Sequence, residues 1–463
     1  MKNPYFLKII SIFGVSLILW ALLAQINNVG TERKERQFEA QQSVEASQAE
    51  QQTLVGPVIQ TQCTEEWTGL TGEGANQKSV LQRRDFTVSA IPTQLAVDAK
   101  TKLEPRYRGI FKVNTYAVQS LITAEWTSLK ALRPQSTQPN SRLSCGAPYV
   151  MTSVSDARGI RRVALQVNGQ QLAARPGSNH AAFPSGFHAE LPEALRGADQ
   201  ALKVSLTLDL IGTGNLSWAP VAESTQVKLA SDWPHPSFAG RFLPVQRDVR
   251  TDGFKAEWQI SALATTAPKN MVAGAPLCTP THGGTPSCIE TFSVSFVDPV
   301  NTYSLSDRAM KYGLLFVGLT FIAVGLVEAL RRLRVHPIQY LFVGCALSIF
   351  FFLLLSLSEH LAFNLAYGLA ATACVTLLTV YGRYLLQGWA GGLSFGAGIG
   401  LLYGCLFVLL QLEQAALVMG SLMLFGVLAV VMLLTRKLDW YALLKADGKA
   451  SDPAPLPNAA ASS

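Results

Sequence analysis

Apolar and polar residues alternate along the chain in long blocks, and the first block is apolar. Residues 4–26 form an apolar run that is long enough to cross a bilayer as a helix, at about 20 residues per span. The run is too long for the core of a signal peptide, and Ala21 and Ala24 have the wrong spacing for cleavage, so we expect an uncleaved anchor over residues 1–26. Residues 27–52 are polar and free of Pro, and predict a helical extension of the anchor.

Residues 53–305 show a different pattern, in which short runs alternate with a period of two. Leu202–Leu210 and Phe292–Phe296 are examples, each with apolar side chains on one face and polar side chains on the other, as in half-buried strands. Pro, Gly, Ser and Thr separate these runs. The pattern predicts a large β-rich domain with sandwich-like packing of its sheets.

The C-terminal part is a series of apolar runs joined by short connections. Each run is close to the length of a membrane span: 311–330, 338–358, 361–381, 390–411 and 415–435. With the anchor they predict about six spans, five of them in a transmembrane bundle over residues 306–437. The expected fold class is therefore a membrane protein of the α+β type. Residues 438–463, rich in Pro and small residues, predict a partly disordered cytoplasmic tail.

Charged residues set the orientation that we expect for these spans. Glu359 and Glu413 mark turns on one side, and basic residues gather in the turns on the other. These basic residues are Arg331, Arg332, Arg334, Arg383, Arg436 and Lys437. Because basic turns stay in the cytoplasm, an even number of spans places both termini there and the β-rich domain in the periplasm. Glu328 lies at helical spacing from Arg331 and Arg332, so a local ion pair is expected.

Two charge features need a separate explanation. Arg33, Lys34 and Arg36 follow the anchor and oppose this orientation, but long domains translocate largely regardless of charge. The net charge of +7 does not indicate nucleic acid as a partner, because a basic surplus beside spans follows from the same rule. No basic stretch is interleaved with aromatic residues as a nucleic-acid groove requires.

The seven cysteines fall into two groups. Four lie in the polar middle of the chain, and three lie inside apolar runs, where they suit helix packing. An even number in an exported domain fits disulfides. We expect Cys278–Cys288, because the short Gly- and Pro-containing loop between them can turn tightly, and leave the pairing of Cys63 and Cys145 open. His282 lies between Cys278 and Cys288, but three candidate ligands are too few for a zinc site, so no metal is expected.

Polar residues at the two turns opposite the basic ones form the candidate membrane site. They are Glu359, His360, Asn364, Tyr367, Gln411 and Glu413. Ionisable groups at membrane depth are costly and often functional, and His360, Asn364 and Tyr367 recur at helical spacing. The alternative is that they cap helix ends at an interfacial turn, where polar groups cost little.

A run of glycines four residues apart is the strongest packing signal. It comprises Gly388, Gly392, Gly396, Gly400 and Gly404. Small residues let helix backbones approach closely in a membrane, so these glycines predict a helix–helix seam. The seam is expected within the bundle, with a contact between copies of a homo-oligomer as the alternative.

Catalytic patterns are absent from the sequence. It has no phosphate-binding Gly-x-x-x-x-Gly-Lys, no Gly-x-Ser-x-Gly elbow and no His-Glu-x-x-His. No nucleophile lies beside a base at a recognisable spacing. We therefore expect a protein that is not an enzyme and that has no cofactor.

Several segments resemble the CreD family of bacterial inner-membrane proteins. They include Phe296–Tyr303, Arg308–Phe316, Leu355–His360, Leu409–Glu413 and Thr435–Tyr441, and, in the middle of the chain, Arg106–Phe111, Trp233–Phe238 and Gly253–Trp258. An acidic pair is expected in the last outer turn, where this chain has Glu413 followed by Gln414. The resemblance supplies no catalytic residues.

The resemblance implies a multi-pass protein of the inner membrane that contributes to cell-envelope integrity and to the response to envelope stress. We expect the periplasmic domain to bind other envelope proteins or envelope components, while the helices contact the lipid bilayer. The alternative is a small transporter or flippase-like bundle with a polar site formed by Glu359, His360 and Asn364. No internal repeat of hydrophobic segments, common in transporters, supports that alternative.

Overall fold

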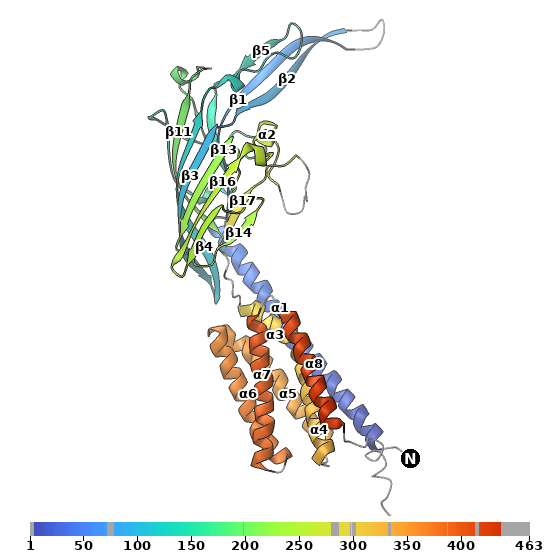
Figure 1. Ribbon diagram of the computed structural model, residues 1–463. Helices are drawn as coiled ribbons and strands as arrows, with labels where there is room; N and C mark the ends of the chain where they lie inside the picture. Colours follow the sequence, from blue (N-terminus) through green and yellow to red (C-terminus); the bar gives the residue numbers. More distant parts are fainter. Residues whose placement is uncertain are drawn as a thin grey trace, which may run out of the picture. The chain divides into compact units, whose positions relative to one another are not determined.

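The computed structural model divides the chain into two compact units. It describes residues 4–71, 78–197, 199–278, 287–296, 298, 302–331, 335–386, 388–412 and 416–436. The helical unit comprises residues 1–36 and 300–463, and the β-rich unit comprises residues 37–299 (Figure 1). Each unit has its own hydrophobic core. The expected combination of an N-terminal apolar helix, a β-rich middle and a series of C-terminal apolar helices is confirmed.

Long helices make up the described part of the helical unit. They are α1 (Pro4–Ser47), α3 (Thr302–Lys311), α4 (Gly313–Arg331), α5 (Pro337–Ser358), α6 (Phe363–Leu385), α7 (Trp389–Gln411) and α8 (Ala416–Thr435). The expected anchor and its polar extension are one helix, α1, whose last residues, 37–47, belong to the β-rich unit. The absence of Pro between Pro4 and Pro57 explains why the helix continues past the apolar run.

Within the described residues, four helices are long and apolar enough to cross a membrane. They are α1, α5, α6 and α7. Helices α3 and α4 form a pair bent by 41°, which counts as a fifth span if it crosses as one unit. In α8 the apolar part, Val418–Leu433, is shorter than a usual span. The six apolar runs expected from the sequence thus correspond to four long helices, one bent pair and one short helix.

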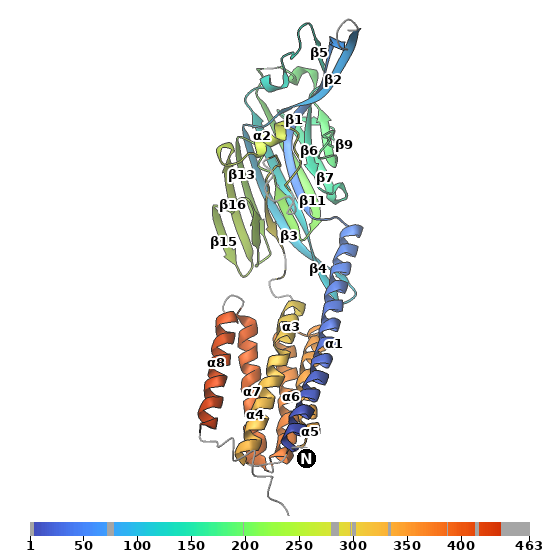
Figure 2. The same ribbon diagram turned by 90° about the vertical axis from the view of Figure 1, so that its right-hand side faces the viewer.

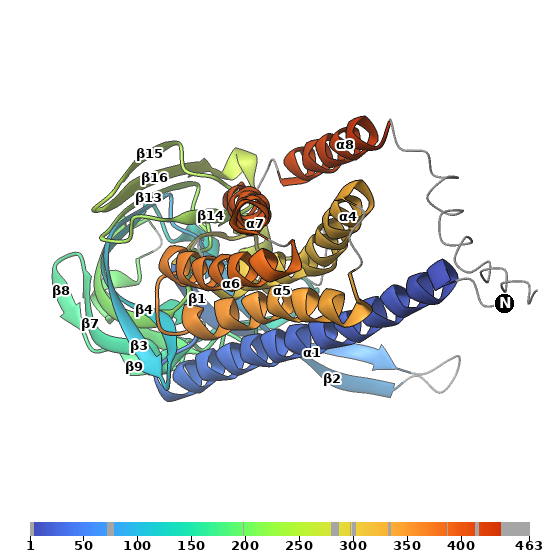
Figure 3. The same ribbon diagram turned by 90° about the horizontal axis from the view of Figure 1, so that it is seen from below.

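Close backbone approaches hold the helical unit together. A Cβ added at Gly344 of α5 would clash with Leu19 of α1, so this glycine gives α1 its place against α5. Helices α5, α6 and α7 pack side by side, with α8 at the edge of the bundle (Figure 3). Most described side chains of α8 are exposed.

Two sheets form the β-rich unit. The nine-stranded sheet has the order β14-β17-β12-β1-β6-β10-β9, and β2 and β5 also pair with β1. Its strands are β1 (Gln52–Thr71), β2 (Lys78–Ala90), β5 (Arg142–Cys145), β6 (Tyr149–Val154), β9 (Arg175–Pro176), β10 (Gly186–Glu190), β12 (Asn215–Trp218), β14 (Ser237–Gly240) and β17 (Phe292–Ser295).

The eight-stranded sheet has the order β15-β16-β13-β3-β4-β11-β7-β8. Its strands are β3 (Gln94–Arg108), β4 (Phe111–Trp126), β7 (Ile160–Val167), β8 (Gln170–Leu172), β11 (Leu202–Thr213), β13 (Ser224–Ser231), β15 (Gln246–Arg250) and β16 (Gly253–Ser261). Among the residues that the structure describes, the one α-helix of this unit beyond the end of α1 is α2 (Ala267–Val272).

Alternating apolar residues build the core between the sheets. Every second residue from Leu202 to Leu210 is buried in β11, as the period of two predicts. Trp218 of the nine-stranded sheet and Trp258 of the eight-stranded sheet lie with ring centroids 6.1 Å apart, and Phe292 packs against both. The half-buried strands expected from the sequence therefore form one core that both sheets share.

Candidate functional site

Two acidic residues fix one end of the membrane part of α1. Glu359 caps the C-terminus of α5, and its carboxylate lies 3.1 Å from Nε of Arg33. Asp307 of α3 pairs with Lys34 at 3.0 Å and with Lys311 at 3.1 Å. Arg33 and Lys34 are two of the residues that oppose the expected orientation. In the folded unit, both have acidic partners on other helices.

A third acidic residue fixes the other end of α1. Glu328 of α4 forms an ion pair with Lys8 and accepts hydrogen bonds from the Tyr340 hydroxyl at 2.9 Å and the Val335 N–H at 3.1 Å. The local pair of Glu328 with Arg331 and Arg332 that the sequence suggests stays a prediction. The side chains of those two arginines lie outside the described residues.

The spacing of these contacts matches a bilayer. Lys8 and Arg33 are 25 residues apart, which corresponds to about 38 Å of helix. A hydrocarbon core of about 30 Å, with the start of the headgroup layer on each side, has this dimension. The ion pairs thus lie where charged side chains reach the membrane surfaces at least cost.

The remaining residues of the candidate membrane site have separate roles. Gln411 of α7 donates a hydrogen bond of 3.1 Å to Asn364 of α6, and both side chains are exposed. Tyr367 is buried and donates to the Tyr403 carbonyl at 2.7 Å. His360 is exposed in the turn between α5 and α6. Glu413 lies outside the described residues.

Several of these residues have contacts between helices. Glu359 contacts α1, Asn364 and Gln411 link α6 to α7, and Tyr367 is part of the core. No group of three or more His, Cys, Asp or Glu that could hold a metal ion occurs among the described residues.

The glycines of α7 contact α6 at two positions. A Cβ added at Gly392 would lie 2.7 Å from the Arg383 backbone nitrogen, and one at Gly396 would overlap Thr379. Gly388, which caps the helix, and Gly404 have no other atom within 4 Å of an added Cβ, and Gly400 has one at 4.0 Å. At 3.6 residues per turn, a step of four residues rotates by about 40° beyond a full turn, so five such glycines cannot share one face.

Both disulfides lie in the β-rich unit. The structure has Cys278–Cys288, the expected pair, and Cys63–Cys145, the pair that the sequence leaves open. Cys63 on β1 lies directly opposite Cys145 on β5 in the sheet. Cys345, Cys374 and Cys405 in the helical unit are free.

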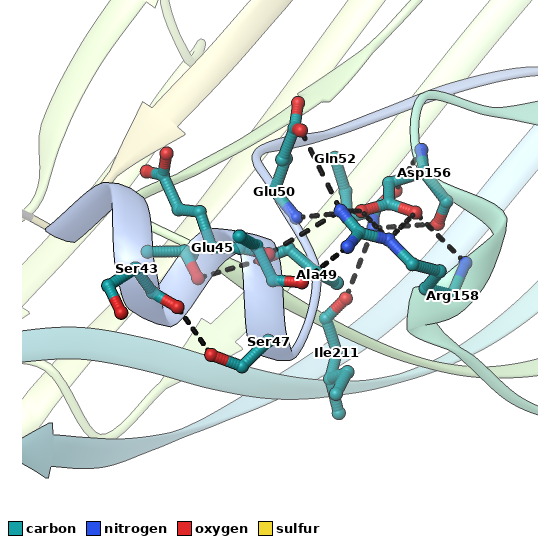
Figure 4. Close-up of polar contacts among 11 residues, drawn as sticks. Ser43, Glu45, Ser47, Ala49, Glu50, Gln52, Asp156, Arg158 and Ile211 are labelled. Atoms are coloured by element: carbon teal, nitrogen blue, oxygen red, sulfur yellow. Dashed lines mark hydrogen bonds and ion pairs between the residues drawn. The ribbon is translucent and has the colours of Figure 1, made fainter.

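Arg158 holds the last turn of α1, an arrangement that sequence analysis did not identify (Figure 4). Its guanidinium donates to the carbonyls of Ala46 at 2.6 Å and of Glu45 at 3.5 Å. These carbonyls are among the last four of the helix, which have no partner within it. The cation also interacts favourably with the negative end of the helix dipole.

Asp156 orients Arg158 and the chain after the helix. Its carboxylate accepts from Nε and Nη2 of Arg158 and from the Glu50 N–H at 3.0 Å. Burial alone raises the pKa of Asp156, but the hydrogen bonds from Arg158 and Glu50 outweigh this effect and hold the pKa below its ordinary value. Gln52 adds to these contacts by donating to the carbonyls of Asp156 and Ile211 (Figure 4).

Glu65 is a buried carboxylate in the β-rich unit. It lies on β1 and accepts hydrogen bonds from the hydroxyls of Thr137 and Ser141 and from the backbone N–H groups of Thr137 and Gln138. These bonds lower the pKa of Glu65 from 4.5 to about 2, and the bond from the Thr137 hydroxyl has the largest effect. Burial acts in the opposite direction and is outweighed. Glu65 thus organises the loop before β5.

Comparisons with known proteins agree with the membrane architecture. The family model described as inner membrane protein CreD matches residues 4–441. The inner membrane protein CreD of Escherichia coli (strain K12) is 35% identical over 452 residues, which cover 97% of each chain. Among solved structures, an M1 zinc metallopeptidase from Deinococcus radiodurans has 10% identity and a TM-score of 0.20, over 44% of this chain and 42% of that one. This weak likeness carries no argument about fold or activity. Because the family model and the relative both extend along nearly the whole sequence, the chain belongs to the CreD family of inner membrane proteins.

Proposed function

We propose that the β-rich unit lies in the periplasm and binds a component of the cell envelope. In this proposal the protein contributes to envelope integrity and to the response to envelope stress, and it catalyses no reaction. The helices anchor it as a multi-pass protein of the inner membrane.

The distribution of disulfides and thiols carries the proposal. All four cysteines of the β-rich unit are paired, and all three of the helical unit are free. Disulfides persist in oxidising compartments such as the periplasm and are rare in the cytoplasm. A chain with its β-rich unit in the periplasm would have disulfides in that unit alone.

The ion pairs of α1 support the same orientation. The basic residues after the anchor are the one charge signal against a periplasmic β-rich unit. Arg33 and Lys34 have acidic partners, Glu359 and Asp307, within the helical unit. At the turn between α6 and α7, the Arg383 guanidinium lies 4.1 Å from the centroid of the Trp389 ring, a combination common at the cytoplasmic surface of a membrane.

The uses of the polar membrane residues support a non-catalytic role. Glu359 binds Arg33, and Asn364 binds Gln411, so these groups stabilise contacts between helices. A purified protein that turned over a defined substrate, with turnover lost in Glu359→Gln, would contradict this part of the proposal.

Cysteine labelling in intact cells tests the location of the β-rich unit. Leu263 is fully exposed in that unit, and Arg436 follows α8. A membrane-impermeant maleimide should label Leu263→Cys without permeabilisation and Arg436→Cys only after it, with the wild-type chain as background. The reverse result would contradict the proposed orientation.

Crosslinking in intact cells tests the binding role. A photoreactive residue at Leu263 and at other exposed positions of the β-rich unit should capture a defined envelope component. Capture of cytoplasmic proteins alone would count against the proposal.

A further inference from the structure

The end of the β3–β4 hairpin projects from its sheet as a two-stranded ribbon. β13 pairs with β3 only as far as Thr101, and β11 pairs with β4 only as far as Thr115. Beyond these residues β3 and β4 continue to pair with each other up to Arg108 and Phe111. Residues 102–114 are called the ribbon below. Its part beyond both neighbouring strands, residues 105–114, extends by about 13 Å at 3.3 Å per residue (Figure 2).

The tip of the ribbon presents apolar side chains to the surroundings. Tyr107 is 66% exposed and Ile110 is 44% exposed. Gly109 has a φ of +59°, which allows the tight turn between them. Exposed apolar side chains at the end of a projecting strand pair have no core to join. They are accessible to an apolar partner.

The ribbon is also basic. It contains four basic residues and one acidic residue, Glu104, which give it a formal charge of +3. The basic residues are Lys102, Arg106, Arg108 and Lys112. Nearby, the Lys112 ammonium lies 5.7 Å from the centroid of the Trp233 ring. Aromatic and aliphatic side chains with a basic surround are typical of segments that enter the headgroup layer of a membrane.

Hydrogen bonds and an ion pair connect the ribbon to the chain segments that lead to the membrane helices. Asn114 donates to the Phe296 carbonyl at 3.0 Å, and Lys112 lies 3.4 Å from Asp298. Asp298 precedes Thr302, the first residue of α3, by four residues, which span at most about 14 Å when extended. On the other side, Arg108 donates to Ser43 in the last turns of α1.

We propose that the ribbon binds the phospholipid surface of the membrane that holds the protein's own helices. Tyr107 and Ile110 enter the headgroup layer, and the net positive charge of the ribbon attracts the phosphates of anionic lipids. This proposal does not depend on which side of the membrane the β-rich unit occupies. Its failure is therefore distinguishable from failure of the proposed function.

Photocrosslinking of the full chain in lipid vesicles tests this surface. A benzophenone amino acid replaces Ile110 or, in a second variant, Tyr107. The matched control places it at Leu263, which is fully exposed and follows the opposite end of the same sheet. Each variant is reconstituted in vesicles of phosphatidylethanolamine and phosphatidylglycerol, irradiated, and examined by mass spectrometry.

Lipid adducts at positions 110 and 107, and none above background at 263, are the expected result. The adduct yield at 110 should fall when phosphatidylcholine replaces phosphatidylglycerol, because the basic ribbon then loses its anionic counterpart. Equal adducts at 110 and 263, or no lipid adduct at either ribbon position, would overturn the proposal. So would crosslinks at 110 and 107 to a second copy of the chain in place of lipid.

Discussion

At the scale of single residues, a few charged side chains set the position of α1. Lys8 and Arg33 bind acidic groups of the bundle, and Arg158 binds the carbonyls of the last helical turn. Each contact joins residues that are far apart in the sequence. Hydrophobic periodicity does not report such pairs, which explains why sequence analysis placed Glu359 at a turn but did not identify its partner.

Replacing Arg158 tests the contacts that hold the last turn of α1. We expect Arg158→Ala to speed amide exchange in the last turn of α1, since two helix carbonyls and the Asp156 carboxylate lose a charged donor. Arg158→Lys should have an intermediate effect, because it keeps the charge but not the planar fork. Hydrogen exchange of the segment 43–52 measures the change. Arg161→Ala, an exposed neighbour, is the control and should leave exchange unchanged.

Glu65 predicts a dependence of stability on pH. Its pKa is about 2 in the folded chain and near 4.5 when unfolded, so its contribution is complete above pH 4.5 and is lost as the pH falls toward 2. Glu65→Gln should lower stability at neutral pH and flatten this acid dependence. Thermal unfolding of both proteins across this range measures it. The neighbouring Glu66→Gln should keep the wild-type slope, and an unchanged slope in Glu65→Gln would contradict the assignment.

At the scale of elements, periodicity predicted the strands and helices, but it did not predict which face of α7 packs against α6. The period of two in Leu202–Leu210 gave both the strand and its buried face, because strand side chains alternate strictly. The glycine run of α7 gave a helix and a close contact. It did not show which glycines touch α6, since that depends on which face of α7 is turned toward the backbone of α6.

The contact between α6 and α7 predicts different outcomes for two glycines of one helix. Gly396→Leu should lower the free energy of unfolding by about 1–3 kcal/mol, because an added side chain overlaps Thr379. Gly404→Leu should have little effect, since no other atom lies within 4 Å of an added Cβ. Thermal stability of both variants in detergent measures the difference. Equal losses would mean that Gly404 also lies in a tight contact, for instance between copies.

At the scale of the whole molecule, the division of the chain differs from the change in hydrophobicity. The first strand begins at Gln52, next to the expected start of the β-rich part at residue 53, and the packing unit that contains it also includes residues 37–47 of α1. The change from apolar to polar residues marks where a helix leaves lipid. The boundary of a packing unit depends on tertiary contacts, such as that between Arg108 and Ser43, which the local sequence does not contain.

Cleavage of the chain tests whether α1 is held by the bundle. In a variant with a protease site at residues 299–301, the fragment that carries α1 should stay bound to the C-terminal helices in detergent after cutting. Combining Glu359→Gln, Asp307→Asn and Glu328→Gln should weaken this association, since each ion pair contributes about 0.2–1 kcal/mol. Co-purification of the two fragments measures it. Complete retention in the triple variant would mean that apolar packing alone holds α1.

The two fixed ends of α1 also limit how this helix can respond to the lipid around it. A free span adjusts to a thicker or thinner bilayer by changing its tilt. α1 is paired with α4 at Lys8 and with α5 and α3 at Arg33 and Lys34, so a tilt of α1 by itself would break these ion pairs. Tilt of the bundle as one body, or deformation of the bilayer at its perimeter, would accommodate a hydrophobic mismatch and keep them.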